Sequence, residues 1–228
     1  MRPPRGYDRR GIFVNRASVL ALITLWLLLL PALFGAHAVH AGTATRILAF
    51  GDSLTAGFGV APAEAFPVRL AARLKADGYD VEVTNAGVSG DTTSGGLARL
   101  DWVLAAHPDI VLLELGANDM LRGIDPKLAQ SNLDAMLARF TAAHIKVLLI
   151  GMKAPGNWGA DYRQAFDGIY PALAKKYGVP LYPFFLDGVA LDEKLNQADG
   201  LHPNKAGVEV IVTRITPAIE RLLGRLAG

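Results

Sequence analysis

The sequence predicts an α/β fold in which a five-stranded parallel sheet is covered by helices on both faces. Short apolar runs of strand length alternate five times with longer helical segments, a pattern typical of parallel sheets with helical crossovers. The run at 110–115 is almost continuously apolar, as expected for a parallel strand buried on both faces. We therefore expect a flavodoxin-like three-layer α/β/α sandwich with strand order 2-1-3-4-5.

The individual elements follow from apolar periodicity and from the turn residues between the periodic segments. We expect strands at 46–50, 81–85, 110–115, 146–150 and 180–183, and helices at 66–76, 97–105, 126–143, 162–177 and 204–223. Pro126 suits a first helical turn, and Gly178 is a typical residue for ending a helix. No second domain, internal repeat or low-complexity linker interrupts this alternation.

The first 41 residues are expected to be a signal peptide, and residues 42–228 a single domain. Five arginines precede an uncharged, mostly apolar stretch at 17–36. This stretch is followed by two small-residue candidates for the cleavage site, Ala38 and Ala41. An uncleaved anchor is the alternative, because about 20 apolar residues can span a bilayer. Pro31 and the small residues after it favour cleavage. We therefore expect an exported, periplasmic protein with no stable membrane span after cleavage.

Charge and composition exclude several classes of function. The first 41 residues hold five arginines and one aspartate, a net +4, so the remainder of this +2 chain carries about −2. Without a basic stripe in that remainder, we expect no nucleic-acid partner. The chain has no cysteine, which excludes disulfides and a thiol nucleophile. No HExxH motif or His/Asp cluster suggests a metal, so we expect no cofactor. The sequence carries no signal for an oligomeric state.

The stretch 47–57 places a hydroxyl at the end of a central strand. An apolar run ends abruptly at Gly51-Asp52-Ser53, and ligands in open α/β sheets bind beyond the carboxyl ends of the strands. Three later segments, 89–91, 116–119 and 199–202, carry polar residues that could converge with Ser53. The expected strand order brings the loops after the first three strands to one edge of the cleft.

These residues supply what acyl transfer requires: a nucleophile, a base, a group that orients the base, and donors for an oxyanion. Ser53 can attack, His202 can take its proton, and Asp199 can fix the imidazole tautomer. The backbone N–H groups of Ser53 and Gly90 and the side-chain amide of Asn118 are suitable oxyanion donors.

Each residue also has a simpler interpretation. His202 could be an ordinary loop residue and Asn118 a turn former, and Gly90 could be needed only because the backbone at that position has a positive φ. Asp199 could be a helix cap. Asp52, Asp91 and Asp119 are better explained as loop or capping residues than as catalytic acids, and His107 and His144 are assigned no role because they lie on the amino-end side of strands.

Four sequence blocks together resemble the GDSL, or SGNH, hydrolase family. They are Gly51-Asp52-Ser53-Leu54, Gly90, Gly116-Ala117-Asn118-Asp119 and Asp199-Gly200-Leu201-His202-Pro203. The resemblance runs from about 45 to 223, and the segments 85–92, 114–119 and 182–185 are similar to the exported bacterial thioesterase I/lysophospholipase/arylesterase subgroup. It implies Ser53 as nucleophile, His202 as base and Asp199 as orienting acid, with Ser53, Gly90 and Asn118 forming the oxyanion hole.

The resemblance also implies that the loop after the fourth strand borders an acyl groove. We therefore expect Lys153, Ala154, Pro155 and Trp158 to contact the substrate. The sequence departs from the subgroup in this loop, at Trp158 and the short Ala154, where chain-length specificity would lie. The expected function is a serine esterase acting on small-molecule acyl esters or thioesters, as an arylesterase, acyl-CoA thioesterase or lysophospholipase.

Three alternatives rank lower. A carbohydrate O-acetyl esterase is disfavoured because the chain shows no carbohydrate-binding module or aromatic platform. A non-catalytic flavodoxin-like ligand-binding protein could use the loop 87–96 for a phosphate, but that loop lacks both a GK[ST] ending and a GxGxxG pattern. An α/β-hydrolase is disfavoured because Ser53 lies in no GxSxG motif.

Overall fold

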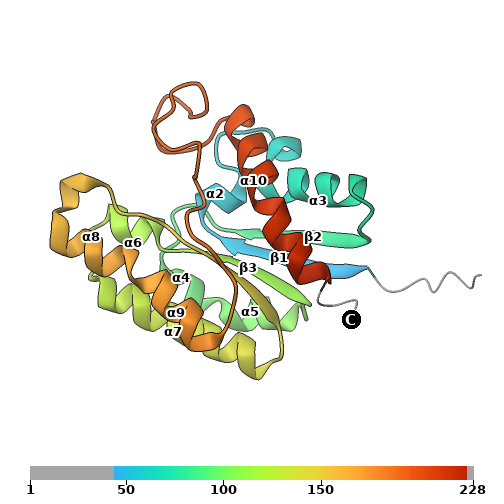
Figure 1. The fold of residues 1–228 in the computed structure, drawn as a ribbon, viewed down its shortest axis with the longest axis horizontal. Helices are drawn as coiled ribbons and strands as arrows, with labels where there is room; N and C mark the ends of the chain where they lie inside the picture. The colour runs from blue at the N-terminus through green and yellow to red at the C-terminus, as the bar shows by residue number, and fades with distance from the viewer. Residues whose placement is uncertain (1–43, 225–228) are drawn as a thin grey trace, which may run out of the picture. The chain divides into compact units, whose positions relative to one another are not determined.

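The computed structural model describes residues 44–224, and these form a parallel sheet between two layers of helices (Figure 1). The strands run in the order β2-β1-β3-β4-β5, and every neighbouring pair is parallel. The expected fold class and strand order are therefore confirmed. The strands are β1 (Thr45–Gly51), β2 (Val81–Gly87), β3 (Ile110–Glu114), β4 (Lys146–Ile150) and β5 (Leu181–Tyr182).

Helices α3 (Phe66–Ala76) and α10 (Lys205–Gly224) cover one face of the sheet (Figure 1). The other face carries α4 (Thr93–Ala98), α5 (Leu100–Ala105), α7 (Pro126–Ala142) and α9 (Ile169–Tyr177). The short elements are α2 (Ser53–Ala56), η2 (Pro62–Glu64), α6 (Ala117–Leu121), η3 (Gly156–Trp158) and α8 (Ala160–Asp167). Because both faces are covered, every residue of β3 is buried, which is what its continuous apolar run predicts.

Two expected helices differ from the sequence prediction. The helix expected at 162–177 is two helices, α8 and α9, which meet at Gly168. Pro171 in the first turn of α9 has no N–H to donate to the preceding turn, so α8 cannot continue through it. The helix expected at 97–105 is also divided, between α4 and α5, and it starts earlier, at Thr93. Thr92 caps that start by accepting a hydrogen bond from the Gly95 N–H at 3.2 Å.

The strand register brings the ends of three strands into line. Gly51 at the end of β1 pairs with Gly87 of β2 on one side and with Glu114 of β3 on the other. The segments that follow these residues carry Ser53, Gly90 and Asn118, and they therefore leave the sheet at one edge. The fold thus places three segments that are far apart in the sequence beside one another.

Candidate active site

Ser53 is the first residue of α2, directly after β1. Asp52 caps this short helix: its Oδ1 accepts the Leu54 N–H at 3.0 Å, and its backbone is not helical. Among the described residues, no acceptor hydrogen-bonds the Ser53 N–H, which is one of the free donors of a helix start. The half-buried Ser53 therefore presents both a hydroxyl and an unpaired backbone donor.

Asp199 and His202 form a tight turn before α10. Asp199 Oδ1 accepts the backbone N–H of Leu201 at 2.9 Å and that of His202 at 3.0 Å, and its Oδ2 lies 2.6 Å from His202 Nδ1. Gly200 has a φ of 69°, which favours glycine in this turn. The hydrogen bonds from the backbone of His202 and Leu201, together with the imidazole, lower the pKa of Asp199 to about 2. Asp199 is therefore an ionised acceptor at neutral pH.

The imidazole connects this turn to Ser53. His202 Nε2 lies 2.9 Å from Ser53 Oγ, so the three side chains form a continuous relay from carboxylate to hydroxyl. The Phe58 ring packs on the imidazole with 4.6 Å between ring centroids. The Gln197 amide donates to the carbonyls of both Phe58 and Pro203, which ties the loop after α2 to the histidine turn. The structure thus brings together the predicted Ser53, Asp199 and His202.

Gly90 occupies the loop after β2 with a φ of 82°. Its carbonyl accepts a hydrogen bond from Arg122 Nη2 at 2.8 Å, which fixes the orientation of its peptide groups. Within residues 44–224, its N–H donates to no acceptor. The positive φ of Gly90 is therefore observed, and its N–H is free to bind an acceptor.

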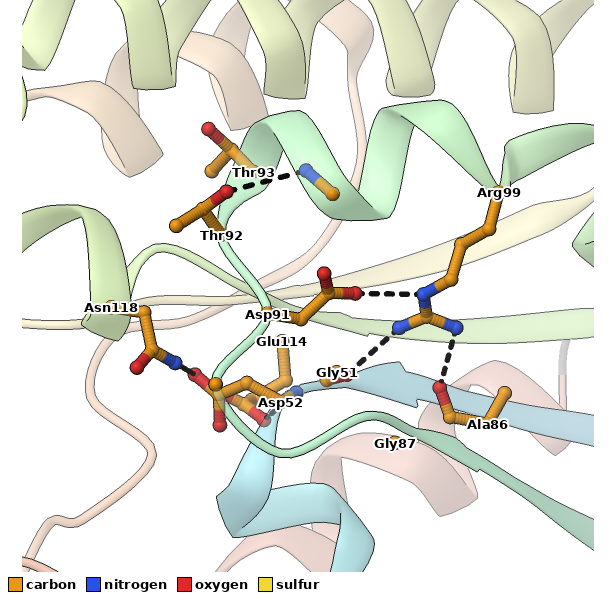
Figure 2. A network of polar contacts seen from close by, with 12 residues as sticks. Gly51, Asp52, Ala86, Gly87, Asp91, Thr92, Thr93, Arg99, Glu114 and Asn118 are labelled. Atoms are coloured by element: carbon orange, nitrogen blue, oxygen red, sulfur yellow. Dashed lines mark hydrogen bonds and ion pairs between the residues drawn. The ribbon is translucent and has the colours of Figure 1, made fainter.

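Asn118 lies in the first turn of α6, a short helix that is not among those expected from the sequence. Gly116 precedes it with a φ of 121°, and a Cβ at that position would collide with the Tyr170 hydroxyl. The Asn118 amide donates one hydrogen bond to Asp52 Oδ2 at 3.1 Å (Figure 2). An amide nitrogen has two N–H groups, so one remains for another acceptor.

Asp52 belongs to a buried carboxyl pair that sequence reasoning did not find. Its side chain is 0 % exposed, and that of Glu114, at the end of β3, is 1 % exposed (Figure 2). Burial raises the pKa of Asp52 to about 6, and burial followed by the charge of Asp52 raises the pKa of Glu114 well above its ordinary range. The only signal in the sequence was a glutamate closing a fully apolar strand.

Arg99, between α4 and α5, was also missed. Its guanidinium donates to the Ala86 carbonyl at 2.8 Å and the Gly51 carbonyl at 2.9 Å, and it pairs with Asp91 at 2.7 Å (Figure 2). It also lies over the Phe50 ring, 4.3 Å from its centroid. One side chain therefore joins the ends of β1 and β2 to the residue that follows Gly90.

A cavity of about 330 Å³ opens beside Ser53 and His202. Its lining is mostly apolar and includes Leu54, Met120, Met152, Phe184, Leu186 and Leu191. Lys153, Ala154 and Pro155, which the sequence analysis expects to contact the substrate, are among its lining residues. Trp158 is not among its lining residues and stacks instead on Tyr162, with 5.3 Å between ring centroids.

The remaining side chains of interest lie elsewhere. His107 and His144 lie next to a depression at the opposite, amino-end edge of the sheet, beside Arg46 and Asp109. In the part of the chain that the structure describes, no three His, Asp or Glu side chains are grouped so that they could hold a metal ion. The same residues include no helix with the length and apolar character to span a membrane.

Known proteins are similar to this chain in sequence. The model of the GDSL-like Lipase/Acylhydrolase family matches residues 49–210. Esterase TesA of Pseudomonas aeruginosa is 41% identical over 181 residues, covering 79% of this chain and 90% of that protein. Thioesterase 1/protease 1/lysophospholipase L1 of Escherichia coli K12 is 42% identical over 167 residues, covering 73% and 79%.

Solved structures of related proteins have the same fold. A crystal structure of TesA superposes with a TM-score of 0.75 at 41% identity, covering 78% of this chain and 99% of that one. The esterase AlinE4, described as a member of the SGNH-hydrolase family, superposes with a TM-score of 0.68 at 45% identity, covering 80% and 98%. With the family match spanning most of the described residues, the chain belongs to the GDSL-like lipase/acylhydrolase family.

Proposed function

We propose that this protein is a serine hydrolase that cleaves acyl esters or thioesters with Ser53 as nucleophile. The observation that carries the proposal is the unbroken relay from Asp199 through His202 to Ser53, with contacts of 2.6 and 2.9 Å, at the mouth of an apolar cavity. A binding module without catalysis would not require a hydroxyl, an imidazole and an ionised carboxylate in line.

In the proposed mechanism, Ser53 Oγ attacks the acyl carbonyl while His202 Nε2 takes the hydroxyl proton. Asp199 holds Nδ1–H and stabilises the imidazolium that forms. The oxyanion is bound by the N–H groups of Ser53 and Gly90 and by the second N–H of Asn118. His202 then protonates the leaving alcohol or thiol, and a water deprotonated by the same imidazole releases the acid from the acyl-enzyme.

The apolar lining supports an acyl chain, rather than a sugar, as the group bound beside Ser53. Met152 and Ala154 are buried in the wall, and Leu191 at the rim is 94 % exposed, so the cavity offers apolar contacts from its interior to its mouth. Relatives carry the names esterase, thioesterase, lysophospholipase and arylesterase, which agree with acyl substrates of this kind.

The test is a panel of p-nitrophenyl esters from acetate to palmitate, with a lysophospholipid and an acyl-CoA, assayed with the wild type and Ser53→Ala. We expect hydrolysis that Ser53→Ala abolishes without loss of folding, and a serine-directed phosphonate that labels Ser53. Ser131→Ala, on the exposed face of α7, is the matched control and should retain full activity. Phosphonate labelling at Ser89 or Ser94 would contradict the assignment.

We also propose export to the periplasm, with signal cleavage near Ala38 or Ala41. The support comes from the sequence pattern of residues 1–41, which lie outside the described residues. N-terminal sequencing of the protein recovered from a periplasmic fraction should give a first residue near Val39 or Gly42. Recovery of the full-length chain only from membranes would show an uncleaved anchor instead.

A further inference from the structure

Asp52 and Glu114 are two buried carboxyl groups close together, so their protonation states depend on each other. Both side chains are almost completely buried, and the Asp52 backbone N–H donates to Glu114 Oε2 at 3.3 Å, so the two residues are in contact. Among residues 44–224, no lysine or arginine pairs with either of them. The other titratable groups that interact with Asp52 are His202 and Asp91, and the buried Tyr170 phenol of α9 interacts with Glu114. Two adjacent buried carboxylates without a cation cannot both ionise.

The hydrogen bonds around the pair decide which member keeps a proton. Asp52 accepts two donors, the Leu54 N–H at 3.0 Å and the Asn118 amide at 3.1 Å, one on each oxygen. Glu114 receives both of its donors on one oxygen: the Thr55 hydroxyl at 2.7 Å and the Asp52 N–H at 3.3 Å reach Oε2. Glu114 Oε1 is buried, and among the described residues no N–H or O–H group donates a hydrogen bond to it. A buried oxygen without a donor is explained if it carries the proton itself.

We propose that Glu114 is a positioning residue: it is held as a neutral carboxylic acid that donates a hydrogen bond to ionised Asp52, and Asp52 in turn orients the Asn118 amide. The proposal rests on the oxyanion role proposed above for Asn118. With one N–H bound to Asp52, the amide plane is fixed and the second N–H has a defined direction.

The neutral state of Glu114 also matters electrostatically. Ionisation of both carboxyls would place a second negative charge beneath the oxyanion hole and oppose the charge that develops there. Thr55 and the Asp52 backbone, both in the nucleophile segment, hold the acid in place. Gly51 leaves room for it, because a Cβ there would collide with Thr55 Oγ1 and Glu114 Oε2. The same acid therefore links the nucleophile turn to the end of β3.

The first test is infrared spectroscopy of the purified protein at about pH 8, where ordinary carboxyls are ionised. The wild type should show the carbonyl stretch of a protonated carboxylic acid, shifted by deuterium exchange and absent from Glu114→Gln. A spectrum without this band, or one in which the band persists in Glu114→Gln, would overturn the neutral state of Glu114. This readout does not depend on catalysis, so it separates failure of this inference from failure of the proposed function.

The second test is kinetic and uses a matched pair of variants. The Glu114→Gln side chain is neutral, can accept a hydrogen bond from Thr55 and can donate one to Asp52, so kcat of this variant should remain within about threefold of the wild type. Glu114→Met lacks these hydrogen bonds and should lose about tenfold in kcat with little change in KM. In an Asn118→Ala background, Glu114→Met should cost almost nothing further, because it acts through Asn118. An equal loss of kcat in Glu114→Gln and Glu114→Met would overturn the positioning role. So would a loss of kcat in the Asn118→Ala/Glu114→Met double variant equal to the two single losses combined.

Discussion

His202 Nε2 lies 2.9 Å from Ser53 Oγ, although 149 positions separate the two residues in the sequence. Neither segment could hold this contact alone. Ser53 is fixed by the end of β1 and its Asp52 cap, and His202 by the Asp199 turn and the Phe58 ring. The Gln197 amide then holds the two loops together through the Phe58 and Pro203 carbonyls.

The first prediction is that Ser53 and His202 act as one unit. His202→Ala should reduce kcat by about as much as Ser53→Ala, because a serine without its base is a poor nucleophile. The double variant should be no worse than either single variant, since each removes the same step. Steady-state kinetics on one p-nitrophenyl ester give kcat for the two single variants and the double variant. Multiplicative losses would indicate that the two residues contribute to different steps.

The second prediction concerns Asp199 and acid stability. Its pKa is lowered to about 2 in the folded protein, below the ordinary value of 3.8, so ionised Asp199 favours the folded state. This contribution is fully present above about pH 4 and is lost as the pH falls towards 2. The difference in melting temperature between wild type and Asp199→Asn should therefore shrink over that interval. Asp161→Asn, on the exposed part of α8, controls for loss of one charge. A difference that stays constant on acidification would contradict the prediction.

The third prediction is that Arg99 fixes the distance between the nucleophile turn and the loop of Gly90. Arg99→Lys should not substitute, because one ammonium cannot reproduce the planar fork that reaches Gly51, Ala86 and Asp91. We expect a loss of about 1–3 kcal/mol in stability from the unpaired carbonyls, with slower phosphonate labelling of Ser53.

The matched control for Arg99 is Arg73→Lys, since Arg73 makes an ion pair with Asp77 at the protein surface. Thermal denaturation and labelling rates compare the two variants. Full labelling and stability in Arg99→Lys would show that charge at this position is sufficient and that the fork geometry is not needed.

Much of this site could be predicted from the sequence because its parts follow strands. Ser53, Gly90 and Asn118 come directly after β1, β2 and β3, and a parallel sheet with this strand order brings those ends together. Asp199 and His202 lie only three positions apart, so their contact is local.

The residues that were missed depend on packing, which the sequence pattern does not encode. Glu114 ends an apolar strand and would be expected at the surface, yet the segment following β1 covers it. Arg99 lies at a helix junction, and its three acceptors come from separate segments. Trp158 is expected to contact the substrate because of its position in the loop after β4, but in the structure it stacks on Tyr162 and is not among the residues that line the cavity. The break at Gly168 was visible in Pro171, three residues later.

The fourth prediction separates Ala154 from Trp158. Ala154 is buried in the cavity wall, so Ala154→Leu should reduce the space for an acyl chain and shift the preference towards short esters. Trp158→Ala should leave the preference unchanged, because Trp158 does not line the cavity. The ratio of kcat/KM for long and short p-nitrophenyl esters is the measurement. A shift caused by Trp158→Ala and not by Ala154→Leu would reverse these assignments.

The last prediction concerns Asn118. If its second N–H binds the oxyanion, the interaction strengthens as charge develops, so its loss should affect kcat more than KM. Removing one such donor typically costs on the order of 10²–10³ in kcat. Asn118→Ala should show a loss of that size with little change in KM, while Asn157→Ala, in the exposed loop after β4, should behave like the wild type.

Asn118→Asp should be at least as damaging as Asn118→Ala. It would place a third carboxyl against Asp52 and Glu114, where two already share a buried site without a cation, and its charge would repel the oxyanion. The change to alanine removes one hydrogen bond to buried Asp52, at a cost of about 1–3 kcal/mol, so the melting temperature should fall by several degrees while the protein still folds. If instead Asn118→Ala kept a near-normal kcat and melted much earlier, the amide would serve to hold the turn, and the Ser53 and Gly90 N–H groups would have to bind the oxyanion without it.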